Sequence, residues 1–167
     1  MTRVTRFVFI AVACCTASAL AQNAGDLLKN YTQKIGGDGL ELNLVHMNAR
    51  TVPVLFKPPT LYAMRAQANE FTMLYVQGTA RQNVDLDTTN FTIEQDGETI
   101  TSTATSIRNF TRGTVAVPRG ERVDGVLTFA KRIDVSKPFV VRHGRDSAQF
   151  RFSAGQLDDI RSAAPQR

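Results

Sequence analysis

Histidines, cysteines and closely spaced carboxylates are the side chains of this sequence that could hold a metal ion. The chain has two histidines, His46 and His143, and its two cysteines, Cys14 and Cys15, are adjacent near the amino terminus. A zinc site takes three or four ligands from cysteine, histidine and carboxylate, so both histidines would have to converge with an acidic residue. We expect instead an exposed strand residue at His46 and a hairpin corner at His143, and we predict no metal and no cofactor.

Serine nucleophiles are equally poorly supported by the sequence. Ser136, Ser147 and Ser153 fall in strand and turn contexts, and the Gly-x-Ser-x-Gly motif is absent. His143, Asp146 and Ser147 are close in sequence, but neighbours around a tight corner usually point apart, whereas triads assemble from distant segments. We predict that the protein is not an enzyme. The alternative is a small secreted hydrolase or metal-dependent enzyme with its site on inter-strand loops.

Two further motifs could bind ions or nucleotides. Asp85 and Asp87 alternate along an extended segment and could offer oxygen ligands to calcium, but the glycine and distal glutamate of an EF-hand loop are missing. A polar inter-strand loop is the favoured interpretation. The glycine-rich stretch 36–39 is not followed by Lys-Ser or Lys-Thr, so it does not predict a phosphate-binding loop.

Charge is distributed unevenly along the chain, whose net charge is +5. Residues 22–107 hold 6 Lys and Arg against 9 Asp and Glu, and residues 108–151 hold 10 against 4. A basic face can attract an anionic partner, although charged residues also simply keep a surface solvated. The candidate binding residues are Arg142, Arg145 and Arg151. We expect a protein or an anionic envelope component as partner, and no nucleic acid, because the aromatic residues of those strands face the core.

The first 21 residues read as a secretory signal peptide. Arg3 and Arg6 precede an apolar run from Phe7 to Cys15, and Ala19-Leu20-Ala21 ends the segment. The run is too short for a transmembrane helix, so none is expected in the mature chain. Cleavage after Ala21 would leave no cysteine and place the protein in the periplasm or outside the cell. The alternative is a lipoprotein cut before Cys14 and anchored by lipid.

The remaining chain divides into three parts. Residues 22–39 predict a short helix, over 24–35, and a glycine-rich linker. Residues 40–153 predict a β-domain, and residues 154–167 a helical turn and tail, with Ser153 and Gln156 spaced as a capping box. No tandem repeat is visible in the sequence.

Alternation of apolar and polar residues from Leu40 onward predicts short strands. The clearest signal is Asp96-Gly97, which predicts a two-residue hairpin turn that places Ile93 opposite Ile100. Phe71, Met73 and Tyr75 are expected to share one face, as are Val123, Leu127 and Phe129. The predicted strands are 40–44, 52–56, 61–67, 71–77, 91–95, 98–102, 114–117, 123–130, 139–141 and 148–152. Short strands without long helices favour an antiparallel sandwich, with a closed barrel as the alternative.

Three late segments carry a family resemblance: Val123-Asp-Gly-Val-Leu-Thr-Phe129, Asp134-Val-Ser-Lys-Pro-Phe139 and Ala148-Gln-Phe-Arg-Phe152. Together they resemble the last strands of bacterial exported immunoglobulin-like domains of the telokin-like extracellular group. The resemblance implies an all-β, antiparallel immunoglobulin-like β-sandwich in the cell envelope or outside it, usually without known catalysis. It carries no site residue over to this sequence.

Overall fold

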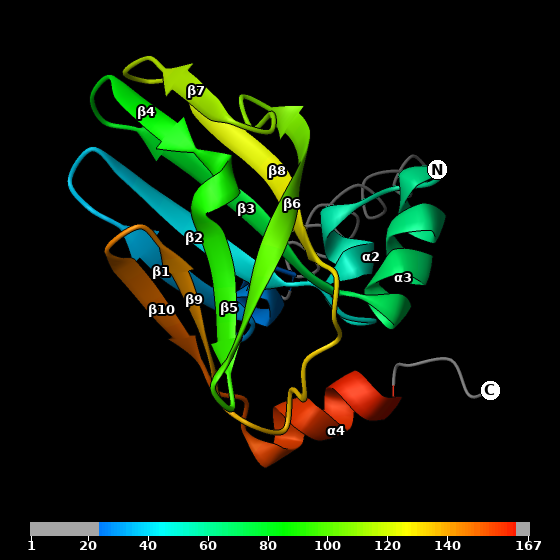
Figure 1. Cartoon of the computed structure of the whole chain (residues 1–167). Coiled ribbons are helices and arrows are strands. Elements are labelled where there is room, and N and C mark those ends of the chain that lie inside the picture. Colours follow the sequence, from blue (N-terminus) through cyan, green and yellow to red (C-terminus); the bar gives the residue numbers. More distant parts are fainter. Residues whose placement is uncertain (1–23, 163–167) are drawn as a thin grey trace, which may run out of the picture.

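The computed structural model describes residues 24–162, and antiparallel β-strands dominate this range (Figure 1). Eight described strands form one sheet in the order β1-β2-β3-β8-β6-β5-β9-β10, and β4 pairs with β7 in a separate ribbon. This confirms the predicted antiparallel β-architecture. The predictions for residues 1–21, including cleavage after Ala21 and lipidation of Cys14, lie outside the described residues.

The bounds of the elements are as follows. The strands are β1 (Thr32–Gly36), β2 (Leu40–His46), β3 (Thr72–Ala80), β4 (Val84–Asp87), β5 (Phe91–Gln95), β6 (Glu98–Arg108), β7 (Thr114–Val117), β8 (Arg122–Phe129), β9 (Phe139–His143) and β10 (Asp146–Phe150). The helices are an N-terminal helix (24–29), α2 (Val52–Leu55), α3 (Thr60–Glu70), the 3-10 turn η1 (Thr88–Asn90) and α4 (Ala154–Ser162).

The β5–β6 hairpin has the predicted register. Gln95 pairs with Glu98, and Ile93 lies opposite Ile100. Asp96 and Gly97 both have positive φ, 51° and 80°, as the two central positions of a type I′ turn require. Local turn chemistry therefore fixes how these two strands pair, and it also sets which side of β5 faces the core.

Strand β6 changes partner along its length. Residues 98–101 pair with β5, whereas Ser102 and the residues after it pair with β8. At the two ends of the strand order, β1 and β10 contact each other. The space enclosed by the strands is filled by large apolar side chains, among them Leu44, Leu127 and Phe129. Val123, Leu127 and Phe129 share this inner face, as predicted.

A second apolar cluster covers the outer face of β2, β3 and β8. Val45, Met73, Tyr75 and Val126 point away from the inner core and pack against residues of the N-terminal helix, α2 and α3. Phe71 packs against the same cluster, so the predicted common face of Phe71, Met73 and Tyr75 is confirmed. Strand β3 is consequently buried on both faces along much of its length.

Two predicted strands, 52–56 and 61–67, are wrong, because these segments form α2 and α3 (Figure 1). The Asn48 side-chain oxygen accepts hydrogen bonds from the backbone N–H groups of Arg50 and Thr51, which turns the chain into α2. Pro53 lies in the first turn of that helix, where backbone N–H groups have no partner within the helix. The missing N–H of proline therefore breaks no helical hydrogen bond. In α3, Leu61, Met64 and Ala68 follow helical spacing and pack on the outer cluster.

The helix predicted over 24–35 ends at residue 29, and the prediction is wrong for its second half. Thr32–Gly36 is strand β1, which pairs with β2 through Thr32 opposite Val45. The glycine-rich stretch is the turn of the β1–β2 hairpin rather than a linker. Gly36 has φ 106°, and a Cβ there would lie 2.3 Å from the Leu40 carbonyl oxygen. Pairing with a neighbouring strand outweighs the helical pattern here.

Side-chain hydrogen bonds stabilise two segments outside the strands, the connection between β8 and β9 and the start of α4. The Gln95 amide donates to the Asp134 carbonyl at 2.8 Å and accepts from the Asp134 N–H at 2.9 Å. At α4, the capping box is confirmed: the Ser153 N–H donates to Gln156 Oε1 at 2.7 Å, and the Gln156 N–H donates to Ser153 Oγ at 3.3 Å. The Gln95 contact links the β5–β6 turn to the segment between β8 and β9.

Gly125→Ala tests the close packing of β8. A Cβ at Gly125 would lie 2.0 Å from Cδ1 of Phe110, whose side chain is fully buried. We expect urea-induced unfolding to show a loss of about 1–3 kcal/mol or more, because the ring has no free space to move into. Gly155→Ala in α4 is the control, since no atom lies within 4 Å of its added Cβ. Equal stabilities of the two variants would contradict this packing.

Candidate functional site

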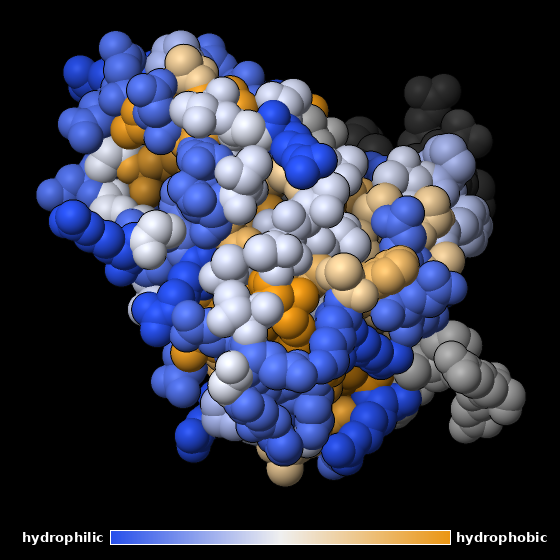
Figure 2. All heavy atoms as spheres, in the orientation of Figure 1, coloured by the Kyte–Doolittle hydropathy of each residue, from blue (hydrophilic) through white to orange (hydrophobic). Residues whose placement is uncertain are grey.

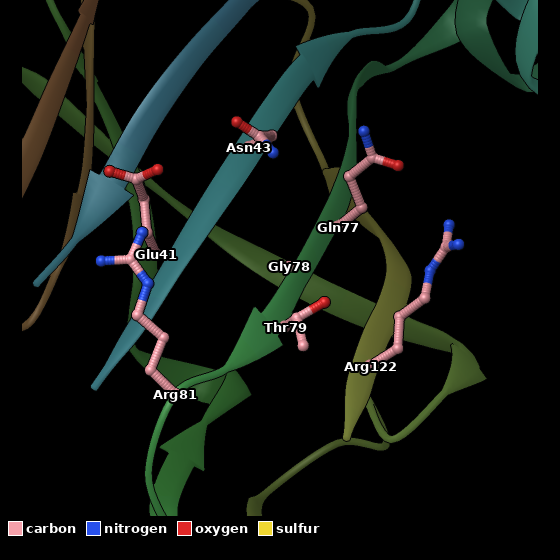
Figure 3. A pocket seen from close by; sticks show the side chains of 7 residues that line it. All are labelled: Glu41, Asn43, Gln77, Gly78, Thr79, Arg81 and Arg122. Atoms are coloured by element: carbon pink, nitrogen blue, oxygen red, sulfur yellow. The ribbon is translucent and has the colours of Figure 1, made fainter. Parts of the chain in front are cut away.

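An open, polar area lies on the outer face of β2, β3 and β8, beyond the part that the helices cover. We call it the polar shelf and define it by the residues that line its hollow: Glu41, Asn43, Gln77, Gly78, Thr79, Arg81 and Arg122 (Figure 3). Asn43 is paired with Gln77, and Thr79 lies between Glu41 and Arg122 in the register of the three strands. Strand alternation sends the side chains of the lining residues at odd positions of β2 and β3, and that of Arg122, outward, while Leu42 and Val76 point into the core. Arg81 follows the end of β3.

Asp124 holds Arg122 in place. The carboxylate accepts from Arg122 Nε at 2.7 Å and from Arg122 Nη2 at 2.9 Å, a two-point contact that fixes the plane of the guanidinium. Tyr75 Oη donates to the same carboxylate at 2.9 Å. Asp124 is only 5% exposed, whereas the Arg122 side chain remains about half exposed. Burial and the Asp124 carboxylate raise the pKa of Tyr75, so its hydroxyl stays protonated as a donor.

Glu41 and Arg81 form the other side of the shelf. Lys34 Nζ lies 2.7 Å from Glu41 Oε1, and this hydrogen bond lowers the pKa of Glu41, with a smaller contribution from the charge of Arg81. Figure 3 shows the Arg81 side chain extending towards Glu41. Lys34 balances Glu41 and Arg122 balances Asp124, so the positive charge of Arg81 is in excess among these five described residues.

The arrangement is suited to binding an oxyanion. Arg81 and Arg122 stand on either side of Thr79, and a guanidinium presents several N–H donors in a planar fork that matches carboxylate or phosphate. Asn43 and Gln77 add amide donors and acceptors. These charged and amide groups are suited to the recognition of a polar, anionic ligand.

Only part of the signal for this site is visible in the sequence. Alternation along 40–44 places Glu41 and Asn43 on the face opposite the leucines. Nothing in the sequence shows that β2 and β8 both flank β3, so the approach of Arg122 to these residues could not be predicted.

The three predicted binding arginines do not form one cluster. Arg142, Arg145 and Arg151 are all exposed, but Arg145 lies in the β9–β10 turn and Arg151 follows the other end of β10. Six residues of extended chain separate these two by roughly 20 Å. Arg142 Nε lies 2.6 Å from Glu94 Oε1, and that contact raises the pKa of Arg142. Its charge is already partly neutralised.

His46 is buried, so the prediction of an exposed strand residue is wrong. It follows Leu40, Leu42 and Leu44 in the inward positions of β2 and is 5% exposed. Its ring lies 5.1 Å from the Phe152 ring, centroid to centroid, and Nδ1 is 3.3 Å from Asn48 Nδ2. Burial, assisted by the nearby charge of Arg132, lowers the pKa of His46 to about 4. The imidazole is therefore neutral at physiological pH.

His143 lies at the β9–β10 turn, as predicted. Its ring stacks on Phe91 with centroids 4.2 Å apart, and Nε2 is 2.9 Å from the Asp87 carbonyl oxygen. Asp146 is paired with His143 across the hairpin, and Ser147 is paired with Arg142. The contacts of His143 thus hold it against β5 and the end of β4 rather than against a serine.

Asp85 and Asp87 lie in strand β4, where a polar loop was expected. The Asp87 carboxylate accepts from the Thr89 N–H at 2.9 Å and from Asn90 Nδ2 at 2.7 Å, capping η1. Hydrogen bonds from Thr89 lower the pKa of Asp87. Residues 24–162 contain no group of three or more His, Cys, Asp or Glu side chains that could hold a metal ion.

Two more findings bear on the setting of the site. Among the described residues, no helix has the length and apolar character needed to cross a membrane. Comparison with protein-family models, curated proteins and solved structures found no match for the chain. A functional assignment therefore depends on the polar shelf and on the residues around it.

His46→Leu tests the consequence of burying a neutral histidine. The pKa of His46 is about 4 in the folded state and 6.5 ordinarily. As the pH falls, His46 is therefore protonated at a higher pH in the unfolded state than in the folded state. The free energy of unfolding that is present above pH 6.5 consequently decreases as the pH drops towards 4. We expect a loss of about 3 kcal/mol from this group, measured by urea unfolding across that range.

The leucine variant should lack this part of the pH dependence, while carboxylates contribute equally to both proteins. His143→Gln is the matched control, since His143 is the other histidine of the chain. Parallel stability curves for the wild type and His46→Leu between pH 6.5 and 4 would refute the assignment.

Proposed function

We propose that the chain is an exported, non-enzymatic binding domain, an immunoglobulin-like β-sandwich that recognises a protein or an anionic component of the cell envelope. The order of basic, apolar and small residues over 1–21 supports export to the periplasm or the cell exterior. The change of partner along β6 supports a sandwich, because it joins the β1-β2-β3-β8 group to the β5-β9-β10 group across one core.

The observation that carries the binding role is the pair of arginines on the polar shelf. Arg122 is held in a fixed orientation by Asp124 and Tyr75, so little conformational entropy is lost when its remaining donors meet a ligand. Arg81 supplies an excess positive charge on the other side of Thr79. The hairpin arginines support binding less well, since Arg142 is engaged by Glu94 and Arg151 lies far from Arg145.

Charge reversal at the two surfaces distinguishes them. Arg81→Glu changes an exposed side chain beside the shelf, and the double variant Arg142→Glu with Arg151→Glu changes the hairpin. In a pull-down from the envelope fraction of the source cell, we expect Arg81→Glu to recover at least tenfold less bound material, because it adds repulsion where an anion would lie. The hairpin variant should recover nearly the wild-type amount.

Equal recovery by all three proteins would argue against the shelf as a binding surface. A loss confined to the hairpin variant would place the binding site at Arg142 and Arg151 instead.

Mass spectrometry of the mature amino terminus tests the proposed export, and it should find Gln22 as the first residue. A lipidated Cys14 would show instead that the protein is anchored.

A further inference from the structure

We infer that the ligand of the polar shelf is an acidic glycan, a hydroxyl-rich chain with carboxylate or phosphate groups at intervals. The inference rests on the proposed binding function and specifies its ligand. It follows from three features of the surface: its continuity across four strands, the polarity of its lining, and the uneven distribution of its unpaired charge.

The shelf continues into a second hollow. This neighbouring hollow shares Asn43 and Gln77 with the shelf, and its other lining residues are Gly25, Leu28, Lys29, Thr32, Gln33 and Lys34. The two hollows therefore form one trough that crosses β8, β3, β2 and β1. Three inter-strand spacings give it a length of about 14 Å, which is longer than a single sugar ring and fits a short stretch of polymer.

The lining favours a hydrated ligand over a lipid or a protein. Amide groups of Gln33, Asn43 and Gln77 and the hydroxyls of Thr32 and Thr79 can exchange hydrogen bonds with sugar hydroxyls. Leu28, which packs partly buried against the outer cluster, is the large apolar side chain in the lining. The large apolar side chains that are exposed in the described part of the chain, Val54, Tyr62 and Ile107, lie outside the trough. Protein interfaces have an apolar centre, and surface binding to membranes buries apolar side chains in the lipid.

Charge sets how acidic the glycan should be. At the β8 end of the trough, Arg122 can bind an oxyanion with the donors that Asp124 leaves free, and Arg81 adds a positive charge across Thr79, beside Glu41. Towards the other end, Lys34 is paired with Glu41, and Lys29 Nζ lies 3.0 Å from Asp26 Oδ1. A ligand with an acidic group on every sugar unit would gain little binding affinity at that end, and the Glu41 carboxylate would repel it. The surface therefore fits a chain in which acidic units alternate with neutral ones.

Isothermal titration calorimetry of the mature protein tests the inference with defined probes. One acidic probe is a hyaluronan tetrasaccharide, which alternates uronate and neutral units, and the other is a short oligomer of sugars joined by phosphodiesters. The tetrasaccharide with methyl-esterified carboxylates is the neutral match. Inorganic phosphate and vesicles of phosphatidylglycerol complete the set. We expect at least one acidic oligosaccharide to bind at least tenfold more tightly than the methyl ester and than phosphate.

Variants assign the binding to the trough. Arg81→Gln should weaken the acidic oligosaccharide about tenfold, because it removes one charge-assisted contact. Gln77→Ala should weaken both the acidic chain and its methyl ester, whereas Arg145→Gln, an exposed turn arginine, should change neither. Circular dichroism of each variant confirms that the fold is retained.

Three outcomes would overturn the inference. In the first, neither acidic oligosaccharide binds, but vesicles bind the wild type and not Arg81→Gln. The proposed anion-binding function then stands, and the inference that the ligand is a glycan is wrong. If an acidic oligosaccharide binds with equal affinity to the wild type and to Arg81→Gln, the trough is not its site. If no probe binds and envelope recovery is unaffected by Arg81→Glu, both the inference and the proposed function fail.

Discussion

The burial of β3 on both faces is the constraint on which the rest of the structure depends. Leu74 and Val76 face the enclosed core, while Met73 and Tyr75 face outward and need a second cover. The N-terminal helix, α2 and α3 supply that cover, but only over the half of β3 that begins at Thr72. Beyond Tyr75 the outward positions change to Gln77 and Thr79, and the sheet face opens to solvent. The polar shelf begins where the apolar residues of this outer face end, after Tyr75.

Tyr75 and Asp124 mark the boundary between these two halves. The Tyr75 ring packs edge-on against Phe56 of the segment after α2, with centroids 5.8 Å apart, while its hydroxyl reaches Asp124. One side chain therefore connects the apolar cluster to the charged surface. Because a buried carboxylate needs partners, Asp124 fixes Arg122 as well. Helix packing and the geometry of the candidate site are linked through this contact.

The parts of the fold that the sequence predicted correctly are those in which local chemistry decides the outcome. Asp96-Gly97 fixes a turn and a register by its backbone preferences, and Ser153 with Gln156 caps α4 within four residues. The errors fall where a distant partner decides. Residues 32–35 have a helical pattern but become a strand because β2 offers an edge. The shelf was missed for the same reason, since its residues come from three strands whose order is set by the whole sheet.

The Gln95 side chain acts as a short extension of the main chain, since its amide exchanges two hydrogen bonds with the backbone of Asp134. Lys137 adds an ion pair to Asp96, 2.7 Å from its carboxylate, at the same turn. These contacts attach the middle of the connection between β8 and β9 to the β5–β6 turn. A protease must draw an extended stretch of chain into its cleft, and the tether leaves little slack for this in the connection between β8 and β9.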